Sequence, residues 1–240
     1  MKTSIPPKRA AATVLASALA FLATGSVTVA QATPIGPSAY LSSADSPFSP
    51  FAGFSYFHLE NFEDHLLNTP GVTASTGGVT SVVFGPTIHD SVDADDGSID
   101  GSGLGGDSFF SGAGGIGISF TFNAGALGGL PDAAGIVWTD GGGTITFEAF
   151  NALNESLGIL TGTHADIRND GGTAEDRFYG VTNTGGISRI HISSSSGGIE
   201  VDHLQYGLRG SVVSVPEPTS LALLGIAGIA GLGAARRHKR

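Results

Sequence analysis

The densest group of residues able to do chemistry is the acidic segment Asp90–Gly101, which reads DSVDADDGSIDG. Ca²⁺ takes about six to eight oxygen ligands from a flexible loop, so four of these carboxylates are candidate ligands. They are Asp93, Asp95, Asp96 and Asp100. The EF-hand pattern fails by register, because position 97 is already glycine and no glutamate follows at the required spacing. A solvated acidic loop is the alternative, since aspartate and glycine are common turn residues.

Two other stretches approach catalytic motifs, and each lacks a required part. Glu200-Val-Asp202 begins a near match to the Glu-x-Asp-x-x-Glu strand of concanavalin-fold glycoside hydrolases, but Gln205 cannot supply the proton that retaining hydrolysis needs. Gly106-Asp-Ser108 echoes the nucleophile block of GDSL hydrolases, which also need an α/β sheet and a later Asp-x-x-His. The six histidines between the two chain ends show no zinc spacing such as His-Glu-x-x-His. We therefore predict that the protein is not an enzyme.

Four aromatic residues offer a different kind of site, because flat aromatic faces can stack on sugar rings. They are Tyr56, Trp138, Tyr179 and Tyr206. Trp138 lies in the apolar run Ala134–Trp138, which is typical of a strand covered on both faces. A core position is therefore favoured for Trp138, and a sugar platform is the alternative.

The elements that position these residues are expected to be strands, because apolar and polar residues alternate with a period of two in nine short runs. The runs are Phe54–Phe62, Val79–Phe84, Gly117–Asn123, Ala134–Thr139, Thr144–Phe150, Leu157–Thr161, Arg177–Val181, Gly186–Ser193 and Ile199–Tyr206. Glycine clusters such as Gly141–Gly143 and Gly197-Gly198 are interpreted as turns between them. This pattern predicts an all-β fold, a β-sandwich or jelly roll, over residues 51–210. The Pro- and Ser-rich segment Thr33–Pro50 is expected to be a flexible lead-in.

The N-terminus has the pattern of a signal peptide. Lys2, Lys8 and Arg9 precede the apolar stretch Ala10–Ala23, and Ala30-Gln31-Ala32 fits a signal-peptidase site. We predict that residues 1–32 are removed by signal peptidase during export.

Charge is concentrated between the two ends of the chain. Residues 33–214 contain four arginines, no lysine and twenty acidic residues, a net charge of −16. Such a surface repels nucleic acid and attracts divalent cations, although solubility alone would also explain it. The chain has no cysteine, which excludes disulfides and thiol chemistry.

The C-terminus, residues 215–240, reads VPEPTSLALLGIAGIAGLGAARRHKR. Its apolar part, Leu221–Ala235, would span about 22 Å as a helix, against roughly 30 Å of bilayer hydrocarbon. The glycines in it weaken both helix formation and membrane affinity, so it would make a poor permanent anchor. The basic end, which includes Arg236 and Arg237, is expected to stay in the cytoplasm.

This three-part tail resembles the PEP-CTERM sorting signal of Gram-negative bacteria. The resemblance rests on Pro216-Glu217-Pro218, the short apolar helix, and the basic end with Arg236 and Arg237. It implies a transient stage in the inner membrane, where an exosortase reads the tail and cleaves near the motif. A simple single-pass anchor is the alternative.

Two short stretches of the body resemble extracellular jelly rolls of the concanavalin and MAM type. They are Asn61-Phe-Glu-Asp64, near the first expected strand, and Val201-Asp-His-Leu204, in the last. In those folds the first and last strands lie side by side. The resemblance therefore implies a second calcium site, in which Glu63 or Asp64 joins Asp202. An ion pair between Asp202 and an arginine is the alternative.

Together these features predict an exported, non-enzymatic protein whose acidic β-sandwich is a structural or adhesive module. It would end at the cell surface or in an extracellular matrix that contains exopolysaccharide. Calcium would be its only cofactor, and no nucleic-acid partner is expected. The alternative function is a carbohydrate-binding module that recognises the exopolysaccharide.

Overall fold

The computed structural model describes residues 31–85 and 89–210, so residues 1–30 of the predicted signal peptide and the whole tail, residues 215–240, lie outside the described residues. The described chain is mostly strand, and all of its strand pairs are antiparallel. The strands are β1 (Thr33–Ala39), β2 (Phe54–Glu60), β3 (Val72–Ala74), β4 (Gly78–Val79), β5 (Phe109–Ser111), β6 (Ile118–Phe122), β7 (Ala133–Phe150), β8 (Ser156–Gly162), β9 (Arg177–Thr182) and β10 (Arg189–Arg209). The helices are short: η1 (Ser43–Asp45), α1 (Thr80–Phe84), η2 (Asp93–Asp96), α2 (Ala124–Leu127) and η3 (Thr173–Glu175).

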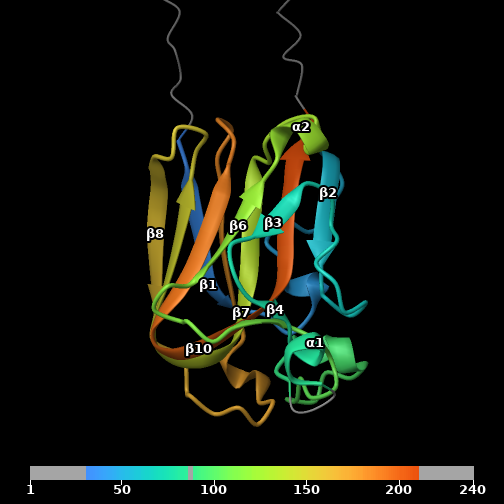
Figure 1. Cartoon of the computed structure of the whole chain (residues 1–240). Helices are drawn as coiled ribbons and strands as arrows, with labels where there is room; N and C mark the ends of the chain where they lie inside the picture. Colours follow the sequence, from blue (N-terminus) through green and yellow to red (C-terminus); the bar gives the residue numbers. More distant parts are fainter. Residues whose placement is uncertain (1–30, 86–88, 211–240) are drawn as a thin grey trace, which may run out of the picture.

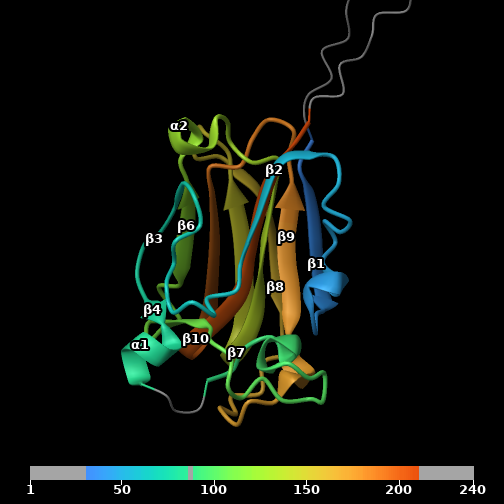
Figure 2. The same cartoon turned by 90° about the vertical axis from the view of Figure 1, so that its right-hand side faces the viewer.

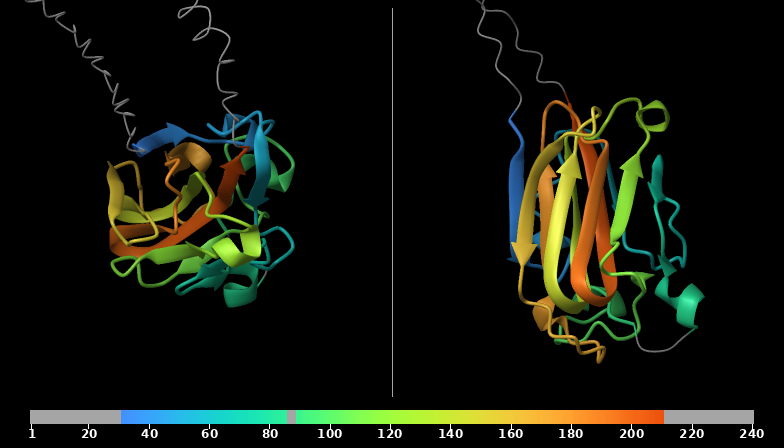
Figure 3. Two further views of the ribbon diagram at one scale, coloured as in Figure 1. Left: turned by 90° about the horizontal axis from the view of Figure 1, so that it is seen from above. Right: turned by 60° about the vertical axis from the view of Figure 1, so that its left-hand side comes forward.

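The two longest strands, β7 and β10, pair with each other and fold the sheet into two layers (Figure 1). One edge of β10 follows β7 with several register shifts, and its other edge pairs in turn with β6, β5 and β2. β1 and β9 extend the layer that holds the first half of β7, where they lie side by side (Figure 2). β8 extends the layer that holds the second half (Figure 3). The predicted all-β sandwich is confirmed.

The glycine clusters that were expected to be turns are instead bends inside continuous strands. Gly141 has φ +144° and Gly143 has φ +80°, and both lie within β7; Gly197, with φ +73°, lies within β10. A Cβ atom built on Gly141 would come within 2.5 Å of the Trp138 ring. Two pairs of predicted strands are therefore two long strands that pass from one layer to the other. Glycine supplies the backbone conformation that this bend requires.

The main hydrophobic core lies between the layers. Its largest side chains include Trp138, Phe120, Phe147, Tyr179 and Tyr206. Along β7, Ile136 and Trp138 enter this core, whereas Val137 belongs to a second cluster on the other face of the layer. The expected core position of Trp138 is confirmed, and the strand around it is buried on both faces.

Two further sequence-based expectations about local structure were wrong. The segment Thr33–Pro50 is not a flexible lead-in: β1 pairs with β9, and Tyr40 and Phe48 are buried against Phe178 in the second cluster. The run Val79–Phe84 is not a strand, because α1 begins at Thr80. The Asp107 carboxylate accepts hydrogen bonds from the Ser81 amide and the Thr80 hydroxyl at the start of that helix. Such capping satisfies amides that a helix leaves free.

Candidate functional site

Acidic residues gather at one end of the sandwich, where α1, η2, η3 and the bends of β7 and β10 lie (Figure 1). We call this the acidic end. It comprises Glu63, residues 89–107, Asp140, residues 164–176, and the β10 residues Glu200–His203. The neighbouring strands β2 and β10 bring Glu60 opposite Leu204, so the predicted contact between the first expected strand and the last is confirmed.

Carboxylates of β10 hold the acidic segment against the sheet. Asp202 accepts hydrogen bonds from the Val92 and His203 amides, and Glu200 accepts one from the Asp90 amide. Asp202 is fully buried, and its pKa is raised by burial and by the neighbouring Asp95. Asp202 is therefore a structural acceptor for a loop that lies about 110 residues earlier in the chain.

The four carboxylates of the first predicted calcium site do not converge on one point. Asp93 is buried and accepts hydrogen bonds from the Asp100 and Gly101 amides and the Thr173 hydroxyl, which fixes the turn. Asp96 accepts the Ser98 amide within its own turn, and both Asp96 and Asp100 are exposed. The structure places only Asp95, of the four, in a cluster able to share an ion.

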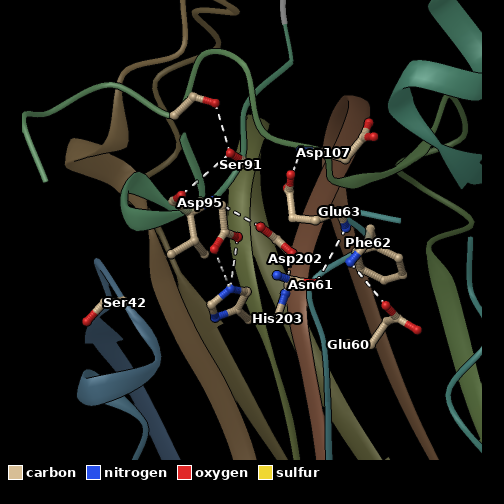
Figure 4. Close-up of polar contacts among 12 residues, drawn as sticks. Ser42, Glu60, Asn61, Phe62, Glu63, Ser91, Asp95, Asp107, Asp202 and His203 are labelled. Atoms are coloured by element: carbon tan, nitrogen blue, oxygen red, sulfur yellow. Dashed lines mark hydrogen bonds and ion pairs between the residues drawn. The ribbon is translucent and has the colours of Figure 1, made fainter. Parts of the chain in front are cut away.

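Asp95 instead meets Asp202 and His203, as the close-up in Figure 4 shows. The His203 Nε2 atom lies 2.9 Å from an Asp95 oxygen, and the Tyr40 hydroxyl lies 2.9 Å from Nδ1. Gln205 donates to the Tyr40 hydroxyl oxygen, so Tyr40 connects Gln205 to His203, and His203 connects Tyr40 to Asp95. Ser46 donates to the Gln205 carbonyl. In this buried chain both ring nitrogens of His203 have a hydrogen-bond partner.

Of the two candidate partners of Asp202 in the second predicted calcium site, Glu63 lies near it and Asp64 does not. Glu63 accepts the Asp107 amide at 2.6 Å. Burial raises the pKa of Glu63 to about 7, and the charges of Asp95 and Asp107 add to this effect. Asp64 is exposed and accepts hydrogen bonds from Leu66 and Asn68 in its own turn. Glu63 thus lies near the Asp95 and Asp202 cluster, and Asp64 does not join it.

A further acidic cluster was not found from the sequence. Asp90, Asp140 and Glu175 each offer an oxygen, and these oxygens lie within 4.8 Å of one another. Burial is the largest cause of a raised pKa in each, to about 9 for Asp90 and about 8 for Glu175, and neighbouring carboxylates raise it further. The three residues are far apart in the chain, and only the pairing of β7 with β10 and the fold of the two loops bring them together.

A pocket of about 600 Å³ adjoins this cluster. The bends of β7 and β10 contribute Gly141, Gly142, Gly197 and Gly198, and its polar side chains are Asp140, Asn169 and Glu200. Phe84 and Phe110 form the aromatic wall, with ring centroids 4.7 Å apart. Pockets of this size, mostly apolar with a few polar groups, are typical of small-ligand sites.

The aromatic platform that was the alternative interpretation of the sequence is not present in the described structure. Trp138, Tyr179 and Tyr206 are fully buried, and the half-buried Tyr56 donates its hydroxyl proton to the Gly129 carbonyl. The accessible aromatic side chains beside the pocket are instead the exposed Phe84 and the half-buried Phe110. Sequence alternation had placed Phe84 on a strand, and so its exposure on α1 was missed.

The catalytic motifs considered above do not form catalytic arrangements among the described residues. Ser108 is fully buried and donates to Glu200, so it is not an exposed nucleophile. Ser81 and Asp107 both contact the same His65 nitrogen, Nδ1, whereas a Ser-His-Asp triad needs both ring nitrogens. Gln205 is buried in the hydrogen-bond chain with Tyr40.

Comparison with known families identifies the tail. Residues 214–240 match the PEP-CTERM protein-sorting motif, which confirms the resemblance seen in the sequence. The chain is therefore an exported protein that an exosortase sorts to the cell surface or beyond. No helix within residues 31–85 and 89–210 has the length and hydropathy needed to cross a membrane, and Leu221–Ala235 lies outside those ranges.

The body is similar to a solved structure at low sequence identity. The C-terminal family 22 carbohydrate-binding module of Clostridium thermocellum Xyn10B matches at 12% sequence identity with a TM-score of 0.31. The match covers 68% of this chain and 97% of that module. A search of curated proteins found no match.

Proposed function

We propose that this chain is a non-enzymatic protein of the cell envelope or extracellular matrix, and that its acidic β-sandwich is a structural or adhesive module. The sorting motif at residues 214–240 carries the proposal, because it directs the body out of the cell. The body's net charge of −16 favours solubility and contact with divalent cations outside the cell.

The hydrogen bonds of the acidic end support a non-enzymatic role. Both ring nitrogens of His203 are engaged, by Tyr40 and by Asp95, so neither is free to act as a base. Both oxygens of Asp202 accept backbone amides. These groups fix the loop on the sheet, and a catalytic acid or base needs a free site for the proton that it transfers.

Delivery is tested by the intact mass of the protein recovered from culture medium, cell surface and membranes. In a host with a working exosortase, protein outside the cell should lack residues 1–32 and the basic end. Replacing Pro216, Glu217 and Pro218 by alanine should leave the tail uncleaved and the protein in the membrane. Stable membrane protein that keeps Arg240 in the unaltered host would overturn the proposal.

A carbohydrate-binding function is the second candidate, and the pocket favours it. Aromatic rings beside carboxylate and amide groups suit a sugar, since rings stack on its apolar face and polar groups bind its hydroxyls. The ligand expected from an exported matrix protein is the exopolysaccharide of the same cell.

The test is a pull-down of the purified body with that exopolysaccharide. Phe84→Ala should weaken binding at least about 10-fold, the loss expected from one stacked ring. Phe51→Ala is the matched control, because Phe51 is also exposed but lies against Phe57, outside the pocket. Equal binding by the two variants would exclude this pocket. Release of new reducing ends would show hydrolysis and contradict the non-enzymatic role.

A further inference from the structure

Three carboxylates from separate parts of the chain meet beside the bends of β7 and β10. Asp140 lies in β7, opposite Glu200 of β10. Asp90 comes from the acidic segment and Glu175 from η3. Their ligand oxygens lie within 4.8 Å of one another, which is about twice a Ca²⁺–oxygen bond length. One ion can therefore reach all three.

The oxygens of this cluster are poorly satisfied by the protein. Asp90 is 2% exposed, and neither of its carboxylate oxygens accepts a hydrogen bond from the described residues. The adjoining Asp176 is 0% exposed, and its two oxygens are also unsatisfied within that part of the chain. Glu175 and Asp140 each use one oxygen, for the amides of Asp166 and Gly141. Buried carboxylates without partners are costly, so this arrangement calls for a cation.

Protein cations do not fill this role among the described residues. The ion pairs there are His65–Asp107, Arg168–Asp170 and His203–Asp95, and none includes the cluster. The nearby Arg177 guanidinium donates to the backbone carbonyls of Ala174 and Asp176 instead of to a carboxylate.

We propose that Asp90, Asp140 and Glu175 bind a calcium ion. The donors are all carboxylate oxygens, which suit a hard cation, and they contain no thiolate or imidazole that would favour zinc or copper. The other acidic group differs, because Asp202 is satisfied by two backbone amides and Asp95 by His203. Bound calcium would join the acidic segment, β7 and η3, and so would fix both loops of the acidic end. This site is distinct from both calcium sites predicted from the sequence.

Calcium titration of the chelator-treated body tests the site. We expect one ion per chain and a rise in melting temperature of about 5–10 °C at calcium near 100 times its Kd. Asp90→Asn should abolish most of this rise. In EDTA the same variant should melt at or above the temperature of the unaltered protein, because the substitution removes a buried carboxyl group whose two oxygens have no partner among the described residues. Magnesium should produce a much smaller rise, since it demands shorter bonds in octahedral geometry.

Asp96→Asn is the matched control, because Asp96 lies in the same acidic segment but is exposed. It should keep the full calcium response. Glu175→Gln is the second test variant, for use if Asp90→Asn does not fold, and it should also lose the response. The proposal is wrong if calcium leaves the melting temperature unchanged. It is also wrong if calcium still raises the melting temperature of a folded test variant. A calcium response that is lost in Asp95→Asn but kept in Asp90→Asn and Glu175→Gln would likewise contradict it.

Discussion

At the residue scale, the acidic end is held by side chains that reach across the sequence. Tyr40, which follows β1, connects Gln205 and His203 of β10, and its ring packs on Phe178 of β9. One hydroxyl thus completes a hydrogen-bond chain between segments more than 160 residues apart. Buried networks of this kind are sensitive to the loss of a single member.

Tyr40→Phe should lower the free energy of unfolding by about 1–3 kcal/mol, because it leaves buried donors and acceptors on Gln205 and His203 without a partner. Urea unfolding measures the change. Tyr56→Phe is the control, since its hydroxyl contacts the Gly129 carbonyl at a half-buried position where water can substitute. Equal losses in the two variants would mean that the Tyr40 network does not contribute to stability.

Glu63 should make stability depend on pH. Its pKa rises from 4.5 to about 7 on folding, chiefly through burial and then through Asp95 and Asp107, against the opposing effects of the Asp107 amide and His65. The folded state therefore keeps a proton that the unfolded chain releases between these values, and the free energy of unfolding falls as pH rises through that window. Glu63→Gln still accepts the Asp107 amide but does not titrate.

We expect Glu63→Gln to gain stability relative to the unaltered protein by about 1 kcal/mol between roughly pH 4.5 and pH 8, after allowance for solvent screening. Urea unfolding in EDTA at both pH values measures this difference without interference from calcium. Glu155→Gln, at an exposed position, is the control. A stability difference that is the same at both pH values would contradict the assignment to Glu63.

At the element scale, the bend of β7 depends on glycine. Gly141→Ala should cost about 2–4 kcal/mol of unfolding free energy, because a side chain at φ +144° is strained and its Cβ would overlap the Trp138 ring. Gly112→Ala is the control, since Gly112 lacks a positive φ and its Cβ would meet the Phe110 ring only at 3.7 Å. Urea unfolding of both variants checks the prediction. If Gly141→Ala loses no more unfolding free energy than Gly112→Ala, the bend tolerates a side chain and the prediction is wrong.

The elements also show what the sequence could and could not predict. The alternation in β6 placed Ile118, Phe120 and Phe122 in the core correctly, because one face of that strand is buried. The same reasoning failed for α1, whose start depends on Asp107, 26 residues later. The sequence pattern also predicted two short strands in place of each of β7 and β10, because glycine clusters occur both in turns and in bends within strands.

The candidate site was harder to predict than the fold. Asp93, Asp95, Asp96 and Asp100 are close in sequence, and this proximity suggested a calcium loop. Their actual partners are backbone amides, Thr173 and His203. Asp90, Asp140 and Glu175 meet only because β7 pairs with β10 and both loops fold over the same end. These three residues are far apart in the sequence, so no local motif could have predicted that their carboxylates meet.

At the scale of the whole molecule, the two ends of the described body lie together and opposite the acidic end. β1 begins and β10 ends at the same end of the sandwich, whereas α1 and the acidic loops lie at the other (Figure 1). The sorting tail follows β10. In the membrane-held stage that the PEP-CTERM resemblance implies, we expect the pocket and the acidic loops to lie at the far end of the body from the attachment point, where they can meet a ligand.

The position of β1 also gives the predicted signal-peptidase site a structural meaning. Thr33 begins β1 directly after Ala30-Gln31-Ala32, so cleavage there leaves the strand intact. A body that starts at Phe51 should fail to fold or should aggregate, because it loses Tyr40 and Phe48 from the second cluster and exposes the edge of β9. Burial of the two aromatic side chains alone contributes about 3–6 kcal/mol, a large part of a typical domain's stability. Circular dichroism and gel filtration, with a body that starts at Thr33 as the control, measure the effect. Equal melting temperatures for the two bodies would show that β1 is dispensable.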